Sequence, residues 1–449
     1  MSEALFPPEP IREAVTRYVA GAARREIPAD VLDLARMCLV DWMGVALGAH
    51  AEPAAAAVRQ VAARWRGQGG ARLLLGGTAP PALAALVNGT MAHCMDYDDT
   101  HTEGAGHLSA PTWATVLALA GEGDHDEAAL LRAFVTGYEV AARLGAEGFG
   151  VALQNRGIHP TSVFGRFAAV CAAAALLELD EERTAHALGA AATMAGGLNA
   201  SFGTMAKPFH AGKAAMDGIL AVELAQAGFV AATQLLDADN GLQGAFVQDR
   251  GARIQPLDFE GGWELRRNGF KPYACRRCTH PSLQAARTLA PALAGRRVAR
   301  VHARVHTGAL IPPGKPVPET PLEARFSLPF CIALGLQGHA AAATDFTADR
   351  LADPALMDLV RRVALEPVPG QSRYAAHLDV HLEGGETLHA DTELVLGHPQ
   401  NPMRWPDMET KFTAMVAPVL GEQAPRLLET LRTFGRPGDL ATALALVAR

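Results

Sequence analysis

Apolar residues recur along the first part of the chain at the three- and four-residue intervals of an α-helix. Residues 28–49 show this pattern clearly. Residues 165–180 are apolar on nearly every face, which predicts a buried helix. Further helices are expected over residues 124–147 and 210–229. The pattern therefore predicts a helical region from about residue 10 to residue 265.

The pattern changes to a period of two after about Gly269. Residues 301–306 alternate apolar and polar side chains, as a half-buried strand does. Residues 376–397 alternate again on both sides of a Gly-Gly pair at 384–385, which predicts a β-hairpin. Helical sequence lies between these strands. This part of the chain is expected to be smaller and of mixed α+β type.

These patterns predict a mainly α fold. Its large all-helical domain is formed by both chain ends, residues 1–268 completed by residues 398–449. The smaller α+β domain, residues 269–397, is inserted between them. A chain of 449 residues, of which 49 % are hydrophobic and 19 % charged, is long and apolar enough for two cores. These numbers exclude a disordered or fibrous protein.

Charge and composition limit the partners. The formal net charge is −7 and no basic run offsets it, so nucleic acid is not expected as a partner. No apolar run approaches the roughly 20 residues of a membrane span. The N-terminal sequence MSEALFPPEP lacks the pattern of a signal peptide. Six scattered cysteines are too few for a disulfide scaffold, so a cytoplasmic location is expected.

Titratable residues gather in five short patches of this apolar chain. The stretch from Met91 to Trp113 holds three histidines and three aspartates. Four other patches place cations or histidines next to proline or glycine, where a helix is expected to begin; they read GIHPTSVFGRF, MAKPFHAGKAA, FKPYACRRCTHPS and EARFSLPFC. A helix N-terminus offers unpaired N–H groups and partial positive charge. With lysine and histidine added, such a place suits carboxylates.

Several of these residues have a simpler structural interpretation. A lone histidine is more often structural than catalytic, and the histidines of the predicted strands are expected on a solvated face. The His125-Asp126 pair is expected to cap a helix. The spacing of Cys275 and Cys278 suits zinc, but no second ligand pair accompanies it. No glycine-rich segment has nucleotide-binding spacing, so no cofactor is expected.

At the five patches the chain resembles the MmgE/PrpD family, whose members include 2-methylcitrate dehydratase, cis-aconitate decarboxylase and iminodisuccinate epimerase. The resemblance covers nearly the whole chain, and its motifs occur in family order; they read NGTMAHCMDYDDTH, GHLSAPTWATVLALAG, GIHPTSVFGRFAAVCAAAALLELD, GTMAKPFHAGKAAMDG, KPYACRRCTHP, ARFSLPFCIALGL and NPMRWPDMETKF. It implies that the α+β domain is a lid over an active site between the domains. It also implies a homodimer without metal or organic cofactor.

Carried over residue by residue, the resemblance implies a set of active-site residues. The catalytic candidates are Asp96, His107, His159, Lys207, Lys271 and His280, and the substrate-binding candidates are Thr100, His210 and Arg276. Two positions depart from the family pattern. Leu108 stands where proline is common, and Phe330 stands where a tyrosine hydroxyl is common.

The reactions of this family share one difficult step, because each builds negative charge on a carbon beside a carboxylate. The enzyme must supply positive charge there, together with a base and an acid. Our hypothesis is that two lysines and His280 bind substrate carboxylates. His107 and His159 transfer protons, and Asp96 orients a histidine. Asp98 and Asp99 are expected only to brace their loop.

The sequence favours a cofactor-free lyase acting on a small di- or tricarboxylate, most simply a hydro-lyase of the 2-methylcitrate dehydratase type. Epimerisation of the iminodisuccinate type is a close alternative, and decarboxylation of cis-aconitate is another. Two further interpretations lie outside the family. One is a protein that binds polycarboxylates without catalysis. The other is a metal hydrolase built on His93, Asp96, His101 and His107.

Overall fold

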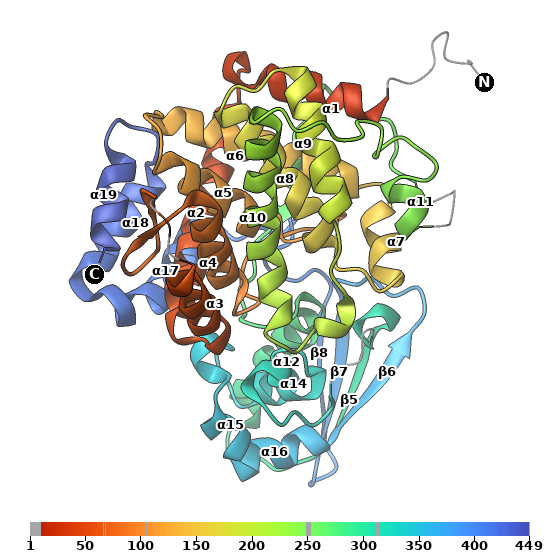
Figure 1. Cartoon of the computed structure of the whole chain (residues 1–449). Coiled ribbons are helices and arrows are strands. Elements are labelled where there is room, and N and C mark those ends of the chain that lie inside the picture. Colours follow the sequence, from red (N-terminus) through yellow and green to blue (C-terminus); the bar gives the residue numbers. More distant parts are fainter. Residues whose placement is uncertain are drawn as a thin grey trace.

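The structure is a computed structural model that describes residues 10–448 except 66, 68, 105, 248–252 and 311–314. Residues 1–9 lie outside the described residues. They contain most of the N-terminal sequence MSEALFPPEP, which was predicted not to be a signal peptide. Figure 1 shows a large helical region above a smaller region that contains the four longer strands. The fold is mainly α, as the sequence predicts. None of the described helices is both long and apolar enough to cross a membrane.

The helical region contains the first eleven α-helices and the last three. The first eleven are α1 (Ile11–Ala20), α2 (Ala29–Gly48), α3 (Pro53–Arg64), α4 (Pro81–His93), α5 (Ser109–Ala120), α6 (Glu127–Gly145), α7 (Phe149–Asn155), α8 (Pro160–Leu176), α9 (Glu181–Met194), α10 (Ala206–Gln226) and α11 (Leu242–Phe246). The last three are α17 (Trp405–Leu420), α18 (Ala424–Arg432) and α19 (Asp439–Leu446). Two short strand pairs, β1 (Ala71–Arg72) with β2 (Thr78–Ala79) and β3 (Thr100–His101) with β4 (Asn268–Gly269), lie among these helices.

Most of the predicted helices are confirmed. Helix α2 occupies nearly the whole of the predicted range, and α8 is buried along almost its entire length, as its uniformly apolar sequence requires. Asp126 caps α6 by accepting a hydrogen bond from Ala129 N, which confirms its predicted capping role. The helical region does not extend to residue 265, however. After α10 ends at Gln226, α11 and short 3-10 turns are the only helices in the described part of residues 227–267.

The smaller region is a four-stranded sheet with helices packed beside it. Its strands are β5 (Val298–His306), β6 (Val363–Val368), β7 (Ala376–Leu382) and β8 (Thr387–Thr392), in the order β6-β5-β7-β8. Its helices are α12 (His280–Leu293), α13 (Pro321–Ala324), α14 (Leu328–Leu336), α15 (Ala348–Ala352) and α16 (Pro354–Arg361). The predicted β7–β8 hairpin is confirmed. The parallel edge strand β6 was not predicted, because Glu366 and Pro367 follow three apolar residues and the strand shows no alternation.

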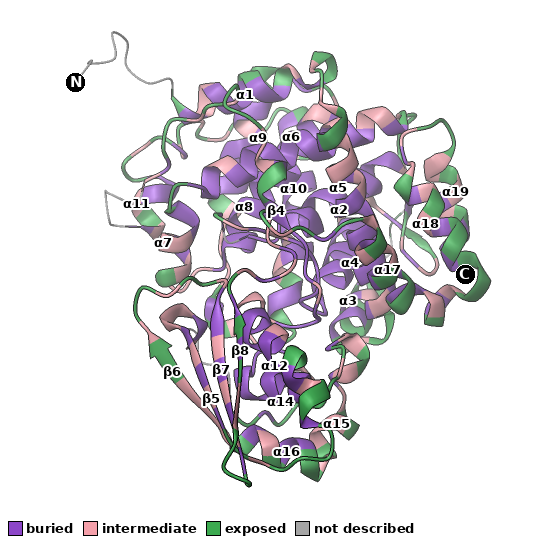
Figure 2. Cartoon of the chain, turned by 180° about the vertical axis from the view of Figure 1, so that it is seen from behind, coloured by how far each residue is buried: buried purple, intermediate pink, exposed green. Residues whose placement is uncertain are grey.

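The C-terminal helices return to the helical region. Helix α17 packs against α2, and Trp405 Nε1 donates to Asp33 Oδ2 at 3.1 Å. Buried residues are concentrated where α2, α4, α5, α8 and α10 lie together (Figure 2). The domain boundaries at residues 268 and 397 stay a prediction.

Glycines let α4 and α10 pack very closely, and this packing places the end of one helix against the start of the other. A β carbon at Gly212 of α10 would lie 2.2 Å from the Leu86 carbonyl oxygen in α4, so no larger residue fits there. A β carbon at Gly89 would lie 3.0 Å from Gly212 Cα. Because the helices run antiparallel, His93 at the end of α4 meets Lys207 in the first turn of α10.

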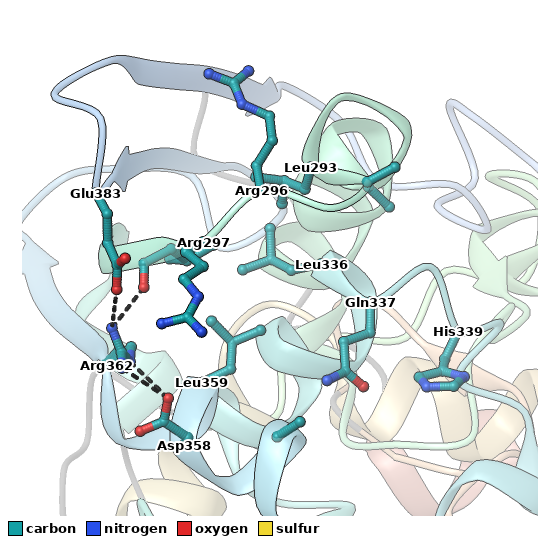
Figure 3. Close-up of a pocket in the computed structure, with 14 residues that line it drawn as sticks. Leu293, Arg296, Arg297, Leu336, Gln337, His339, Asp358, Leu359, Arg362 and Glu383 are labelled. Atoms are coloured by element: carbon teal, nitrogen blue, oxygen red, sulfur yellow. Dashed lines mark hydrogen bonds and ion pairs between the residues drawn. The ribbon is translucent and has the colours of Figure 1, made fainter.

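A pocket of about 750 Å³ opens in the smaller region between α12, α14, α16 and the sheet (Figure 3). Arg362 crosses one side of it and pairs with Asp358 at 2.9 Å and Glu383 at 3.9 Å. None of the predicted site residues lines this pocket. The titratable residues of the five sequence patches gather elsewhere.

Candidate active site

The loop after α4 carries an aspartate whose carboxylate binds two lysines. Lys207 Nζ donates to Asp96 Oδ1 at 2.8 Å, and Lys271 Nζ donates to the same oxygen at 2.9 Å. Lys271 also donates to the backbone carbonyl of Asp96 at 2.7 Å. All three side chains are buried. Both lysines therefore lie at one point, but around a carboxylate of the chain itself.

The backbone of this loop turns Asp96 toward the lysines. Asp96 has φ +50°, in the left-handed region that aspartate and asparagine tolerate better than most residues. Such a conformation in a buried loop occurs where the surrounding contacts impose it, and functional sites are enriched in it. Here the two hydrogen bonds from Lys271 hold the residue at both its backbone and its side chain.

Electrostatics keep Asp96 ionised. Burial alone would raise the pKa of its carboxyl, but Lys207 and Lys271 outweigh burial and hold that pKa well below its usual range. Burial lowers the pKa of Lys207, and Asp96 partly offsets this effect. Two ammonium groups on one carboxylate oxygen leave local positive charge around that oxygen. This arrangement suits a second carboxylate, such as that of a substrate.

Asp98 joins two histidines on the other side of this loop. Its carboxylate oxygens lie 2.9 Å from His93 Nδ1, and Oδ2 lies 3.2 Å from His107 Nδ1. Burial would raise the pKa of Asp98, but His107 and His93 together hold it well below the usual range. The expectation that Asp98 only braces the loop was therefore wrong. Its carboxylate is part of the site.

The contacts of His93 determine its tautomer. Its Nε2 lies 3.0 Å from Lys207 Nζ, and an ammonium group can only donate, so Nε2 accepts. The ring proton is then on Nδ1, which donates to Asp98. Burial, partly opposed by Asp98, lowers the pKa of His93 to about 4, so the ring is neutral near pH 7. His93, named at first only as a metal ligand, thus links the lysines to Asp98.

These residues form one buried group, called here the Asp96 cluster; it consists of His93, Asp96, Asp98, His107, Lys207 and Lys271. His107 lies just before α5, and its Nε2 is 3.7 Å from Asp96 Oδ1. Burial lowers the pKa of His107 despite the charge of Asp98. Asp96 was expected to orient a histidine, but its short hydrogen bonds go to lysines. The orientation of His107 comes from Asp98, and Thr161 Oγ1 accepts from its backbone N at 2.9 Å.

A second pair of histidines adjoins this cluster. His159 precedes α8 and is 2 % exposed, and its ring lies 5.9 Å from that of His93. Its Nδ1 is 3.0 Å from Nδ1 of His210, which lies one turn after Lys207 on α10. Burial and the charge of Lys207 hold the pKa of His159 well below its usual value. Burial lowers the pKa of His210 to about 4.

The remaining predicted residues are less directly involved. Thr100 Oγ1 lies 3.5 Å from His107 Nδ1, which is a long contact. His280 donates from Nε2 to the Cys275 carbonyl at 3.0 Å, and its buried Nδ1 has no hydrogen-bond partner among the described residues. Arg276 donates to the Ala309 carbonyl at 3.4 Å. No hydrogen bond within the described residues joins His280 to the Asp96 cluster.

The two phenylalanines of the FSLPFC motif have different surroundings. Phe330, the departure from the family pattern, is buried in α14 and its ring lies 6.0 Å from that of Phe346. Phe326 lies beside the cluster, because Lys207 Nζ is 6.0 Å from its ring centroid and 5.5 Å from that of Phe202. These two rings, 6.1 Å apart, form an apolar wall next to Lys207.

A second buried ion pair supports the loop from behind. Lys411 of α17 lies 2.6 Å from Asp41 of α2 and donates to the Tyr97 carbonyl at 2.7 Å. Asp41 accepts from the backbone N of Asp99 at 2.9 Å. Asp99 accepts from Ser109 and Asn268, so its predicted bracing role agrees with its contacts. Two helices far apart in sequence thereby fix the backbone that carries Asp96.

Arg325 joins the smaller region to this loop. Its guanidinium lies 2.6 Å from Glu52 and donates to the Cys94 carbonyl, two residues before Asp96, at 3.2 Å. The side chain is almost fully buried. Neither Arg325 nor Lys411 was predicted, since their partners come from distant parts of the chain.

The cluster also contains a geometry that could suit a metal ion. Ligand atoms of His93, Asp96, Asp98 and His107 lie within 4.8 Å of one another. His101, the other ligand of the metal hypothesis, instead contacts Glu264 at 3.0 Å. Ammonium groups already lie within about 3 Å of Asp96 Oδ1 and His93 Nε2, where a metal would bind. A divalent ion there would face two positive charges, so these donors do not fit a metal.

Comparisons with known proteins find that the chain is similar to one family of enzymes over most of its length. A family model described as the MmgE/PrpD N-terminal domain matches residues 13–255, and one described as the MmgE/PrpD C-terminal domain matches residues 273–433. Cis-aconitate decarboxylase of Homo sapiens is 29 % identical over 357 residues, which cover 76 % of this chain and 74 % of that protein. Cis-aconitate decarboxylase of Aspergillus terreus is 25 % identical over 455 residues, which cover 94 % and 92 %.

Proposed function

This chain belongs to the MmgE/PrpD family, and we propose that it is a lyase that decarboxylates cis-aconitate or a tricarboxylate close to it. The observation that carries the proposal is the meeting of Lys207 and Lys271 on one buried carboxylate oxygen. The names of the relatives support this reaction over the others that the family performs.

The lysines address the difficult step of the reaction. When the C–C bond to the leaving carboxylate breaks, carbon dioxide departs and an electron pair stays on a carbon that is still flanked by carboxylates. Buried ammonium groups stabilise this charge far more than water does, because the site is already oriented and its dielectric is low. We propose that Lys207 and Lys271 bind the carboxylates of the substrate beside Asp96.

A histidine then completes the reaction by forming the new C–H bond. The candidates are His107 and His159, both buried beside the lysines and both with lowered pKa values. The wall of Phe202 and Phe326 keeps the dielectric low where the charge develops. The cation groups and the proton donors thus surround one small space, as decarboxylation requires.

Dehydration of 2-methylcitrate, which the sequence alone favoured, remains the second candidate. One observation favours it. Dehydration needs a base and an acid at once, and the neutral histidines His93, His107 and His159 could supply both. The same cluster serves either reaction, so the substrate decides between them.

Proton NMR in deuterium oxide tests the proposal. The protein is incubated separately with cis-aconitate, 2-methylcitrate, citrate and iminodisuccinate. Release of carbon dioxide from cis-aconitate, with a product that has lost one carboxylate, supports the proposal. A new alkene from 2-methylcitrate without carbon dioxide would replace it with dehydration. Deuterium entering iminodisuccinate with no loss of a group would replace it with epimerisation.

Matched variants of α10 show whether the cluster performs the reaction. Lys207→Met should abolish turnover, because it removes one of the two cations on Asp96. Lys213→Met is the control, since Lys213 pairs with Asp217 outside the cluster. Equal activity of the Lys207 variant and the control would show that the reaction occurs elsewhere.

We also propose the homodimer, the lid and the cytoplasmic location that the sequence predicts. Leu220, Phe229 and Val230 are 37 %, 47 % and 77 % exposed near the C-terminal end of α10, away from the cluster, and support a subunit contact there. The six cysteines are unpaired, as in a reducing compartment. Light scattering of the protein and of a Leu220→Glu variant tests the dimer.

A further inference from the structure

The hydrogen bond between His159 and His210 joins like atoms. Both partners contribute Nδ1, and these atoms lie 3.0 Å apart. Only one of the two nitrogens can carry the proton between them when both rings are neutral. The pair therefore has two states. In one, His210 donates and His159 carries its own proton on Nε2; in the other, His159 donates and His210 carries its proton on Nε2.

The pair also leads from the interior toward the surface. His159 is 2 % exposed and lies beside His93, whereas His210 is partly exposed. Gly197 lies beside both residues, because its carbonyl accepts from the His159 backbone N at 3.0 Å and a β carbon on it would be 3.4 Å from His210 Cε1. Leu198, next to Gly197 in the chain, is 58 % exposed.

We propose that His210 is a relay residue that passes a proton from solvent to His159 while His159 protonates the substrate carbon. The inference rests on the proposed function. Decarboxylation consumes one proton in each turnover, because a carboxylate is replaced by hydrogen. Dehydration and epimerisation return the proton that they remove, so they need no supply from outside.

The relay solves a problem of charge at His159. This ring is neutral, since burial and Lys207 oppose its protonation. A neutral imidazole is a poor acid, because loss of its only N–H proton would leave an anion. If Nδ1 receives a proton from His210 as Nε2 gives one to carbon, His159 stays neutral throughout. His210 in turn takes a proton from solvent on its Nε2.

The protons balance over a full cycle. During chemistry, one proton enters at His210 Nε2, one moves between the two Nδ1 atoms, and one leaves His159 Nε2 to form the C–H bond. After the product departs, water reaches the open site and protonates His159 Nε2. The proton on His159 Nδ1 returns to His210, which releases its Nε2 proton to solvent. The relay is needed only while bound substrate excludes water.

Two variants at position 210 and one control variant distinguish a relay role of His210 from a structural one. His210→Gln keeps an N–H donor toward His159 but cannot pass a proton on. His210→Ala removes the ring and leaves space for a small molecule. His186→Ala is the control, because His186 is another partly exposed histidine, and within the described residues its side chain hydrogen-bonds to the Ala231 backbone and to no other group.

We expect kcat for carbon dioxide release to fall about 100-fold in both His210 variants, within the range that acid catalysis contributes. KM should change little. Added imidazole should restore kcat of His210→Ala in a saturable way. The rate of the wild-type protein in mixtures of light and heavy water should show three protons in motion, and that of His210→Gln only one.

The results that would contradict the relay differ from those that would contradict the proposed function. Wild-type release of carbon dioxide with an unchanged kcat in His210→Gln would overturn the relay alone. A loss of kcat that imidazole does not restore, with an unchanged isotope response, would also overturn it and leave His210 a structural residue. If the wild-type protein releases no carbon dioxide, the proposed function fails, and with it the need for a proton supply.

Discussion

Lys207 donates a hydrogen bond to Asp96 Oδ1 over 2.8 Å, and both side chains are buried. Lys271 shares that oxygen at 2.9 Å. The carboxylate thus holds two like charges together that would otherwise repel each other in a medium of low dielectric. Under the proposed function, its role is to keep both positive charges at the place where a substrate carboxylate would bind.

Asp96→Asn should therefore disable the site more than its small change in shape suggests. The amide keeps a left-handed backbone accessible, but it no longer balances Lys207 and Lys271. We expect kcat/KM to fall at least about 100-fold, in line with the roughly 100- to 1,000-fold that removal of one electrostatic group from an active site costs. Steady-state assays with cis-aconitate measure this. A change of less than threefold would contradict the role of Asp96.

The two lysines should differ in their effect on stability. Lys207→Met leaves Asp96 paired with Lys271, whereas Lys271→Met also removes the hydrogen bond to the Asp96 backbone. Both variants should lose turnover. Lys207→Met in turn removes the hydrogen bond to His93 Nε2, so each variant loses one bond besides the one to Asp96 Oδ1. Denaturation in urea should still show a larger loss of unfolding free energy for Lys271→Met, by about 1 kcal/mol, because its second bond holds Asp96 in the left-handed conformation, whose cost is of this order. The opposite order would mean that the loop is held mainly by α10.

The sequence predicted these lysines but not their arrangement. Helices such as α2 and α8 can be predicted from the sequence because the spacing of their apolar residues is visible within each helix. The contact between His93 and Lys207 depends on how α4 packs on α10, and the spacing of residues within either helix does not predict that packing. His93 and Asp98 could have been predicted as site residues, since both lie within the motif that carries Asp96. Asp98 is expected from the sequence to brace the loop because the positions of its two histidine partners cannot be inferred without the fold.

The ion pair of Lys411 and Asp41 behind the loop could not be predicted from the sequence, for a simpler reason. Lys411 donates to the carbonyl of Tyr97, 314 residues earlier in the chain. A single lysine in an amphipathic C-terminal helix usually lies in solvent. Only the tertiary structure shows that it is buried against Asp41.

Lys411→Met should destabilise the protein and slow the reaction together. It would leave Asp41 buried without its cation and free the Tyr97 carbonyl, which lies beside Asp96 in the chain. We expect a loss of about 3–5 kcal/mol of unfolding free energy, measured by urea denaturation. Adding Asp41→Asn should recover part of this loss, because the unpaired charge disappears. A double variant less stable than Lys411→Met would contradict this pairing.

Chelation should leave activity unchanged. The ligand-like atoms of the Asp96 cluster already bind ammonium groups, so a metal ion would have to displace them. Turnover after dialysis against EDTA, with elemental analysis of the same sample, tests this. Loss of activity that Zn²⁺ or Mn²⁺ restores, with about one ion per chain, would revive the metal hydrolase.

Asp99→Asn should change how stability depends on pH. Burial and the charge of Asp41 raise the pKa of Asp99 to about 7, well above its value in an unfolded chain. Between about pH 4 and pH 7 the folded state thus holds a proton that the unfolded state lacks, so this stabilisation is lost progressively over that range and is absent above about pH 7. Asparagine does not titrate, so the melting temperature of the variant minus that of the wild type should rise between about pH 5 and pH 7 and then level off. Asp98→Asn is the control. The pKa of Asp98 lies well below its usual range, so the difference in melting temperature between this variant and the wild type should stay constant.

A parallel pH dependence of Asp99→Asn and the wild type would show that Asp99 is ionised throughout and that Asn268 and Ser109 alone stabilise its charge.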